Sequence, residues 1–251
     1  MTIKFDTTNG FFSGIHNNRI KGTSLEDYGI QKTVQAIIPT LNEENTIGLV
    51  IKHTEYYVDE VLIIDGRSHD NTVEILKDNG VRYLIQEGIG KGSALRQAFT
   101  EATGDMIIIL DADGSMLPNE IPRYLKELSL GADVVKGSRF LPEGGSDDLS
   151  PIRRIGNRFF IILVNLLYGL NLTDVCYGYM AFTSDAIKKI LPELRSDGFD
   201  IEAEIIIKAA KLGLDIHEVP SYELNRAFGK SNLKAFRDGL KILKVIIKGL
   251  F

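Results

Sequence analysis

Short apolar segments alternate with amphipathic segments through the first half of the chain, and this alternation limits the possible folds most strongly. Five runs rich in Val and Ile fit strands buried on both faces: Val34–Pro39, Val61–Asp65, Val81–Gln86, Met106–Asp111 and Asp133–Ser138. The segments between them suit helices: Glu44–Glu55, Asn71–Asn79, Lys91–Thr103 and Pro118–Leu130. This order predicts an α/β fold with a mostly parallel sheet flanked by helices.

The rest of the chain departs from this alternation. We expect helices at Ile152–Gly169 and Asp200–Leu212 and a strand at Ile216–Pro220, whereas residues 1–33 show no sustained hydrophobic period. With 251 residues, of which 44% are hydrophobic, the chain can form one large packed domain. We therefore expect a lead-in at residues 1–33, a domain at 34–232 and an appended helix at 233–251.

Charge is distributed unevenly along the chain. Residues 226–251 contain seven Lys or Arg and one Asp and so carry +6; because the whole chain carries −5, the remainder carries −11. Within residues 234–251 the cations form one stripe and the apolar side chains the adjoining face, which predicts a C-terminal amphipathic helix in contact with a membrane surface. A helix packed on the domain or on a partner subunit is the alternative.

The expected compartment follows from cysteine content and hydropathy. Cys176 is the sole cysteine, so no internal disulfide can form and a reducing environment is expected. No zinc-ligand spacing occurs, and no signal segment begins the sequence. The longest apolar stretch, Phe159–Leu170, is shorter than the roughly 20 residues that span a bilayer. We expect a cytoplasmic protein, peripheral on the cytoplasmic membrane face, with no nucleic-acid partner.

Polar and glycine-rich segments follow the carboxyl ends of all five predicted strands. They are Pro39–Glu44, Asp65–Thr72, Gln86–Gly92, Asp111–Ser115 and Gly137–Arg139. In open parallel sheets a ligand binds in the crevice beyond these strand ends. Their common placement therefore predicts one binding site at that edge of the sheet.

Asp111 and Asp113 are the residues that most clearly indicate chemistry. They directly follow the apolar run Met106–Leu110, so both carboxylates can reach one point as the chain turns. Mg²⁺ and Mn²⁺ favour a few carboxylate oxygens and leave coordination sites for substrate phosphates. We predict Mg²⁺ or Mn²⁺ on this pair, neutralising a diphosphate leaving group. A turn with an aspartate capping the next helix is the alternative.

Several cations are candidates for binding phosphate. Lys91 lies among Gly88, Gly90 and Gly92, where tight turns can bring backbone and lysine to a nucleotide phosphate. Guanidinium groups bind phosphate through two hydrogen bonds. The other candidates are Arg139, Arg153, Arg154, Arg226 and Lys230. The last two flank a glycine in a loop that suits a flap closing over a ligand. Each cation, taken singly, also fits a surface charge.

In this order, the segments resemble the family-two glycosyltransferases of the GT-A fold, from about Val34 to Leu233. The general match rests on Ile38–Glu44, Ile64–Thr72, Gly90–Gly92 and Asp111–Asp113. Within the family, the chain looks most like the dolichol-phosphate mannosyltransferase and polyprenyl-phosphate hexosyltransferase branch. That likeness rests on Gly137–Gly145, Asp174–Phe182 and Arg226–Leu233. The resemblance implies a GT-A type sheet and a metal-dependent hexosyltransferase that uses a GDP- or UDP-sugar and a lipid-phosphate acceptor.

The resemblance further implies a nucleotide site. Pro39, Glu43 and Asp65 would line the nucleotide pocket, and Asp111 would bind the diphosphate through the metal. Lys91 completes the set as a phosphate contact. The second predicted strand is followed by Asp-Gly-Arg-Ser, where many relatives have Asp-Asp-Gly-Ser, so one usual acid is missing.

An acceptor site and a closing loop are implied in the same way. Arg139 and Arg153, with Asn157, would hold the phosphate of the acceptor. Arg226 and Lys230 would close over the phosphates and complete the catalytic set with the two metal-binding aspartates.

The reaction this set favours is a single in-line displacement that inverts the anomeric carbon. A lipid phosphate is already mostly ionised near neutral pH, so it needs no general base. A hydroxyl acceptor would need a carboxylate to take its proton, and Asp200, Glu202, Glu204 and Asp174 are the candidates. For Glu202 and Glu204 we favour an ordinary position on a helix surface.

Three other functions are consistent with parts of the pattern. A transferase acting on a soluble or glycan hydroxyl would use the same donor site, and a non-catalytic scaffold could bind the sugar nucleotide without turnover. A nucleotidyltransferase usually has a glycine-rich, basic loop after its first strand. Here the corresponding segment, Pro39–Glu44, is acidic, which disfavours that function.

Overall fold

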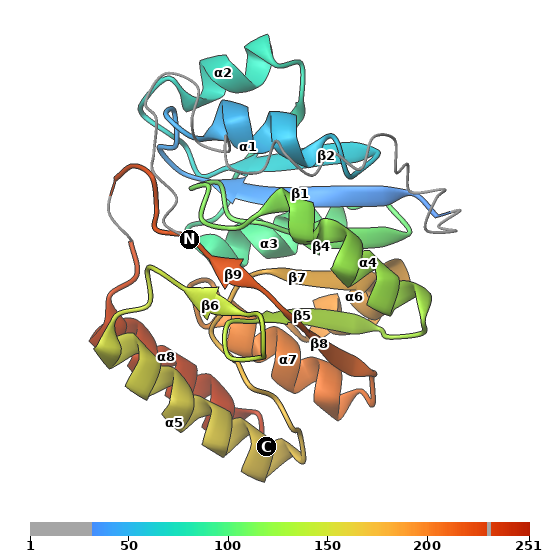
Figure 1. Ribbon diagram of the computed structural model, residues 1–251, viewed down its shortest axis with the longest axis vertical. Coiled ribbons are helices and arrows are strands. Elements are labelled where there is room, and N and C mark those ends of the chain that lie inside the picture. Colours follow the sequence, from blue (N-terminus) through green and yellow to red (C-terminus); the bar gives the residue numbers. More distant parts are fainter. Residues whose placement is uncertain (1–31, 230–231) are drawn as a thin grey trace. The chain divides into compact units, whose positions relative to one another are not determined.

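The computed structural model describes residues 32–229 and 232–251, and its residues from Lys32 onward form one compact unit. Residues 1–31 of the predicted lead-in lie outside the described residues, and so does Lys230. A seven-stranded sheet in the order β3-β2-β1-β4-β7-β5-β8 runs through the unit (Figure 1). Its strands are β1 (Val34–Thr40), β2 (Glu60–Asp65), β3 (Arg82–Ile85), β4 (Met106–Ile109), β5 (Val134–Ser138), β7 (Met180–Thr183) and β8 (Ile216–Pro220).

The predicted mostly parallel sheet is confirmed, with one strand unforeseen. Strand β7 lies between β4 and β5 and runs antiparallel to both. It carries the chain back across the sheet, so β4 and β5 are not neighbours as their order in the sequence would suggest. The expectation that all five early strands are buried on both faces is wrong for β3, which forms the sheet edge and is partly exposed along its length.

Helices cover both faces of the sheet. They are α1 (Ile47–Thr54), α2 (Thr72–Asp78), α3 (Lys91–Thr100), α4 (Ile121–Ser129), α5 (Pro151–Tyr168), α6 (Ser184–Ile190), α7 (Ile201–Lys211) and α8 (Ala235–Lys248), with short 3₁₀ turns η2 (Pro118–Glu120) and η3 (Leu191–Glu193). The helices α3, α6 and α7 share the main apolar core with one sheet face, while α4 packs on the other. The helices α5 and α8 pack on each other and on α7 as an outer layer (Figure 1).

Local residue chemistry explains the ends of α5. Ser150 accepts a hydrogen bond from the backbone N–H of Arg153, and Pro151 occupies the first turn, where its missing N–H costs nothing. Gly169 ends the helix with φ 67°, a left-handed conformation that glycine adopts without strain. These signals place Arg153 and Asn157 in the first two turns of α5.

The parallel strands bring the predicted polar segments to one edge. Thr40 at the end of β1 pairs with Asp65 at the end of β2, and β4 ends beside β1. A small second sheet of β6 (Gly145–Ser146) and β9 (Tyr222–Glu223) lies over the same end of the unit. Within the described part of the chain, no helix is both long and apolar enough to cross a bilayer.

Candidate active site

Asp111 and Asp113 leave the carboxyl end of β4 as the sequence predicts. The chain turns at Gly114, whose φ of 75° a residue with a side chain rarely adopts. Ser115 then donates to Asp113 from both its backbone N–H and its hydroxyl, at 2.9 and 2.7 Å. These bonds fix the Asp113 carboxylate, while the Asp111 side chain stays 30% exposed and available to a ligand.

Lys91 joins Asp111 to a third acid. Its Nζ lies 2.6 Å from Asp111 Oδ1 and 2.8 Å from Glu202 Oε1, and all but 10% of its side chain is buried. Burial disfavours a charged lysine, but the two carboxylates more than offset this and raise its pKa. Burial also raises the pKa of Glu202, against the opposing charge of Lys91. The lysine therefore supplies a fixed positive charge at the floor of the site.

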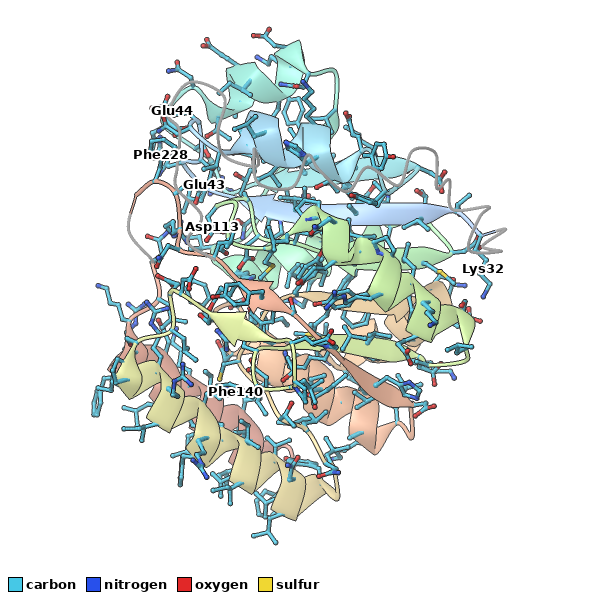
Figure 2. The ribbon with its side chains drawn as sticks, viewed as in Figure 1. Lys32, Glu43, Glu44, Asp113, Phe140 and Phe228 are labelled. Atoms are coloured by element: carbon cyan, nitrogen blue, oxygen red, sulfur yellow. The ribbon has the colours of Figure 1, made fainter. Side chains whose placement is uncertain are left out.

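Arg226 makes a similar bridge at Asp113. Its two terminal nitrogens lie 2.8 Å from Glu43 Oε1 and 2.7 Å from Asp113 Oδ2. Glu43 and Asp113 lie close together beyond the strand ends (Figure 2). Burial raises the pKa of Glu43, partly opposed by the charge of Arg226. The predicted closing loop thus contacts the aspartate pair directly, although Lys230 is outside the described residues.

The donor set at Asp111 and Asp113 fits a divalent metal. In the described residues, no cluster of three or more His, Cys, Asp or Glu side chains is arranged to hold an ion. Mg²⁺, however, is commonly bound through one or two carboxylates, with water and substrate phosphates as its other ligands. The oxygens that would face such an ion are paired with Lys91 and Arg226, so positive charge already lies where the metal charge would be.

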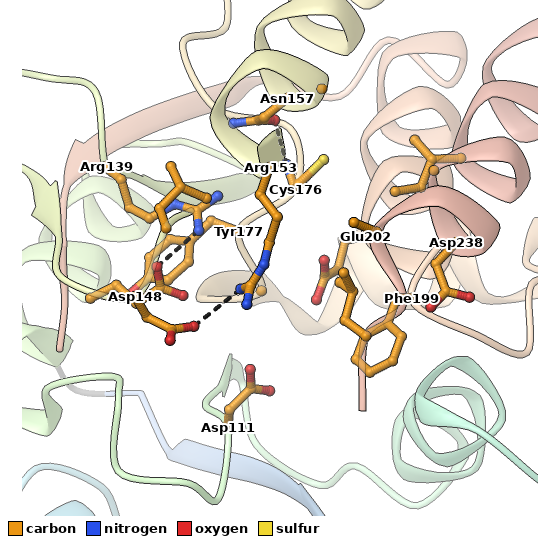
Figure 3. A pocket seen from close by; sticks show the side chains of 18 of the residues that line it. Asp111, Arg139, Asp148, Arg153, Asn157, Cys176, Tyr177, Phe199, Glu202 and Asp238 are labelled. Atoms are coloured by element: carbon orange, nitrogen blue, oxygen red, sulfur yellow. Dashed lines mark hydrogen bonds and ion pairs between the residues drawn. The ribbon is translucent and has the colours of Figure 1, made fainter. Parts of the chain in front are cut away.

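A pocket of about 260 Å³ extends from these carboxylates between the N-terminal ends of α5 and α8. Figure 3 shows the side chains of Asp111, Arg153 and Glu202 directed into the same space. Apolar side chains also line the walls: Leu149, Ile152, Phe160, Phe199, Leu233, Phe236 and Ile242. The pocket therefore combines charged groups at the strand ends with apolar side chains, most of them from α5, α8 and the segments that lead into these helices.

Of the predicted acceptor-phosphate residues, Arg153 is the most available. Its guanidinium contacts Asp148 Oδ2 at 3.1 Å, and its side chain is 28% exposed at the pocket. Arg139 also lines the pocket but is buried, with its donors directed to Asp174 and Glu223. Its charge and hydrogen bonds hold the pKa of Asp174 low, although burial alone would raise it.

Asn157 belongs to the same buried network. Its amide donates to Asp174 Oδ1 at 2.8 Å and its carbonyl accepts from the backbone N–H of Cys176 at 3.2 Å. These bonds fix the loop before β7 against α5. The geometry thus gives Arg139 and Asn157 a positioning task, and it leaves Arg153 as the member of the trio that can turn toward an anion.

Of the predicted nucleotide residues, Lys91 and Asp111 line the pocket, whereas Pro39, Glu43 and Asp65 lie beside it. Pro39 is half-buried near the end of β1, and Asp65 is fully buried at the end of β2. Asp65 accepts from the backbone N–H and hydroxyl of Ser68 at 3.0 and 2.6 Å. With Glu43 they form a second region of the sheet edge, connected to the pocket through Arg226 and Asp113.

Glu202 is the site residue that the sequence interpretation placed wrongly. We expected Glu202 and Glu204 on a helix surface, yet both are buried. Glu204 accepts from the backbone N–H groups of Arg195 and Ser196, which is a structural role. The signal was present in the sequence, because α7 is apolar around most of its circumference and such a helix is buried on all sides.

Comparisons with known proteins show the family of the chain. A family model described as Glycosyl transferase family 2 matches residues 35–191. Glycosyltransferase AglJ of Haloferax volcanii is 35% identical, over 81% of this chain and 67% of its own length. Undecaprenyl-phosphate mannosyltransferase of Micrococcus luteus is 31% identical, over 86% of this chain and 94% of its own.

A solved structure shows the same fold. Glucosyl-3-phosphoglycerate synthase from Mycobacterium tuberculosis, crystallised with Mn²⁺, UDP and phosphoglyceric acid, superposes with a TM-score of 0.72. The alignment covers 90% of this chain and 81% of that chain at 21% sequence identity. The predicted GT-A type architecture is therefore confirmed.

Proposed function

Because the chain belongs to glycosyl transferase family 2, as its motifs predicted, we propose that it moves a hexose from a nucleotide-sugar to a polyprenyl or dolichyl phosphate. The reaction is a single displacement that inverts the anomeric carbon. The catalytic domain comprises residues 34–232, and residues 233–251 are an appended helix that contributes to the pocket wall.

The observation that carries this proposal is the mixed lining of the pocket. It contains Asp111, Lys91 and Arg153 together with apolar side chains of α5 and α8. A lipid phosphate is anionic at one end and apolar at the other and can use both kinds of contact, whereas a sugar hydroxyl acceptor gains little from apolar walls. The mannosyltransferase from Micrococcus luteus, whose name specifies undecaprenyl phosphate, supports the same acceptor class.

On the donor side, Asp111 and Asp113 would hold Mg²⁺ or Mn²⁺, which offsets the charge that develops on the nucleoside diphosphate as it leaves. The nucleotide binds along the sheet edge at Pro39, Glu43 and Asp65. The synthase from Mycobacterium tuberculosis, crystallised with UDP and Mn²⁺, supports a donor of this class.

Cations of this chain assist the departure of the diphosphate. Lys91 contacts the phosphates from the pocket floor. Arg226 and Lys230 close over them once Arg226 releases Asp113 and Glu43. Preorganised positive charge of this kind stabilises a transition state more than the ground state.

On the acceptor side, Arg153 binds the lipid phosphate, while Arg139 and Asn157 hold the surrounding loop in place. The phosphate is mostly ionised at neutral pH and attacks without a general base. Glu202 stays paired with Lys91 and takes no proton. A hydroxyl acceptor is the second candidate, favoured by the raised pKa of Glu202, since a carboxylate in the pocket could then accept the hydroxyl proton.

The test is a transfer assay with radiolabelled GDP- and UDP-hexoses and detergent-solubilised undecaprenyl phosphate. We expect one donor to give a lipid-linked sugar, and Arg153→Gln to raise the KM for the lipid about tenfold with the donor KM unchanged. Arg82→Gln, at the far edge of the sheet, is the matched control. Transfer only to free sugars would favour the hydroxyl acceptor, and binding of donors without any transfer would leave a scaffold.

A further inference from the structure

Helix α5 has an apolar face that the core does not use. Its buried residues, Asn157, Phe160 and Val164, are turned toward the rest of the domain, where α5 packs on α7 and α8. On the opposite side, five large apolar side chains recur at intervals of three and four residues and are between 49% and 76% exposed: Ile152, Ile155, Phe159, Ile162 and Leu166. Single exposed apolar residues are ordinary on a protein surface, but a continuous row along a whole helix is not.

Helix α8 presents a second exposed apolar row. Its buried positions are Asp238, Ile242 and Ile246, and the row itself comprises Phe236, Leu240, Ile247 and Leu250, which are between 43% and 83% exposed. The sequence pattern alone predicted this face. The sequence pattern did not indicate the exposed row of the neighbouring helix, α5.

The two rows are adjacent because the helices pack side by side. Phe160 of α5 lies against Gly239 of α8, and the hydroxyl of Tyr168 donates to the carbonyl of Ile246 at 2.5 Å. Ile152 and Phe236, the first members of the two exposed rows, both line the pocket between the helices, so the rows meet there. The result is one apolar surface, here called the α5–α8 face.

Cations border this face on both flanks. Arg154 and Arg158 are exposed on the flank of α5 away from the seam, and Lys241, Lys244 and Lys248 are exposed on the far flank of α8. Neither helix contributes an exposed acid: α5 contains none, and the single acid of α8, Asp238, is buried. The face is thus apolar in the middle and positive at its edges.

We infer that the α5–α8 face docks the protein on an anionic lipid bilayer, with the apolar rows inserted at the interface and the flanking cations on lipid headgroups. In this mode of binding, the inserted apolar area and the attraction of the cations to anionic lipids both contribute to the binding free energy. A second copy of the chain is the less favourable occupant, because two such faces would bring cationic flanks together with no exposed acid on either helix to compensate.

Docking in this way places the pocket at the membrane. Ile152 and Phe236 belong both to the α5–α8 face and to the pocket lining, so the pocket opens onto this face. A lipid phosphate could then reach Arg153 while its chain stays in the bilayer. This last step rests on the proposed function, whereas the docking itself does not.

The test is co-sedimentation of the full chain with vesicles of phosphatidylcholine, with and without phosphatidylglycerol, that contain no polyprenyl phosphate. We expect binding to the anionic vesicles and a loss of about tenfold or more in the double variant Ile155→Glu, Ile162→Glu. Leu130→Glu changes an equally exposed leucine beyond α4 and should bind as the wild type does.

A second variant tests the cationic edge without altering the apolar rows. Lys244→Gln with Lys248→Gln should weaken binding to anionic vesicles by about fivefold per lysine, and added salt should weaken wild-type binding. Absence of wild-type binding to anionic vesicles would overturn the inference. A second result would also overturn it. Sedimentation velocity without lipid would show a dimer of the wild type that the Ile155→Glu, Ile162→Glu variant does not form, and vesicles would bind neither protein. Sugar transfer to a detergent-solubilised acceptor does not require binding to vesicles, so the proposed function is tested separately.

Discussion

Lys91 and Arg226 each bridge two acids, and in both cases one of the acids is an aspartate of the proposed metal pair. The sequence indicated both cations as phosphate ligands but not the acids that hold them, because Glu43 and Glu202 are distant along the chain. In the proposed reaction a metal ion would replace these cations at the aspartates, and Lys91 and Arg226 would then be available to the diphosphate.

The ion pair of Lys91 and Glu202 gives a testable dependence of stability on pH. We expect Lys91→Met to lower the free energy of unfolding by about 3 kcal/mol near pH 8, because a buried carboxylate loses its partner. Burial already raises the folded-state pKa of Glu202 above its ordinary value of 4.5, and loss of Lys91 raises it further. A group with a raised folded pKa stabilises the fold when protonated, so the deficit should grow as pH rises through that pKa.

Urea denaturation near pH 5 and near pH 8 measures this effect. Lys91→Met combined with Glu202→Gln should recover most of the loss, since the uncompensated buried carboxylate is then removed. An equal loss at both pH values, with no recovery in the double variant, would show that Lys91 stabilises the fold through packing and not through its charge.

At the scale of elements, local signals were reliable where they were strong. The strands β1, β2, β4 and β5 and the helix α5 begin and end within a few residues of their predicted limits, because buried Val and Ile runs, a serine cap and a closing glycine specify them locally. Strand β7 and helix α6 were missed. Strand β7 has four residues, and its position depends on pairing with β4 and β5, which the sequence around it does not encode.

The cap of α5 connects an element to the site. Ser150→Ala removes the acceptor for the backbone N–H of Arg153 and should cost about 1 kcal/mol of unfolding free energy. Because Arg153 lies in that first turn, we also expect a higher KM for the lipid acceptor with little change in the donor KM. Ser150→Asp keeps an acceptor at the cap and serves as the control. Equal effects of the two substitutions on stability would contradict the capping account.

At the scale of the molecule, the sequence predicted the fold class and the edge of the sheet where the candidate site residues meet, because parallel strands end together and their polar ends are visible in the sequence. It did not predict which apolar residues remain exposed. Ile155 and Leu166 resemble core residues in a linear pattern, and only the packing of α5 against α7 and α8 shows that they face outward. Burial of this kind depends on tertiary contacts that hydrophobic periodicity alone cannot supply.

The central claim is a metal-dependent nucleotide site at Asp111 and Asp113, and calorimetric titration of GDP and UDP tests it most directly. We expect one nucleotide to bind only with Mn²⁺ or Mg²⁺ present, and Asp113→Asn to weaken that binding about tenfold or more by removing one ligand charge. The Arg82→Gln variant should bind as the wild type does. Nucleotide binding that is equally tight without metal, or unchanged in Asp113→Asn, would contradict the account.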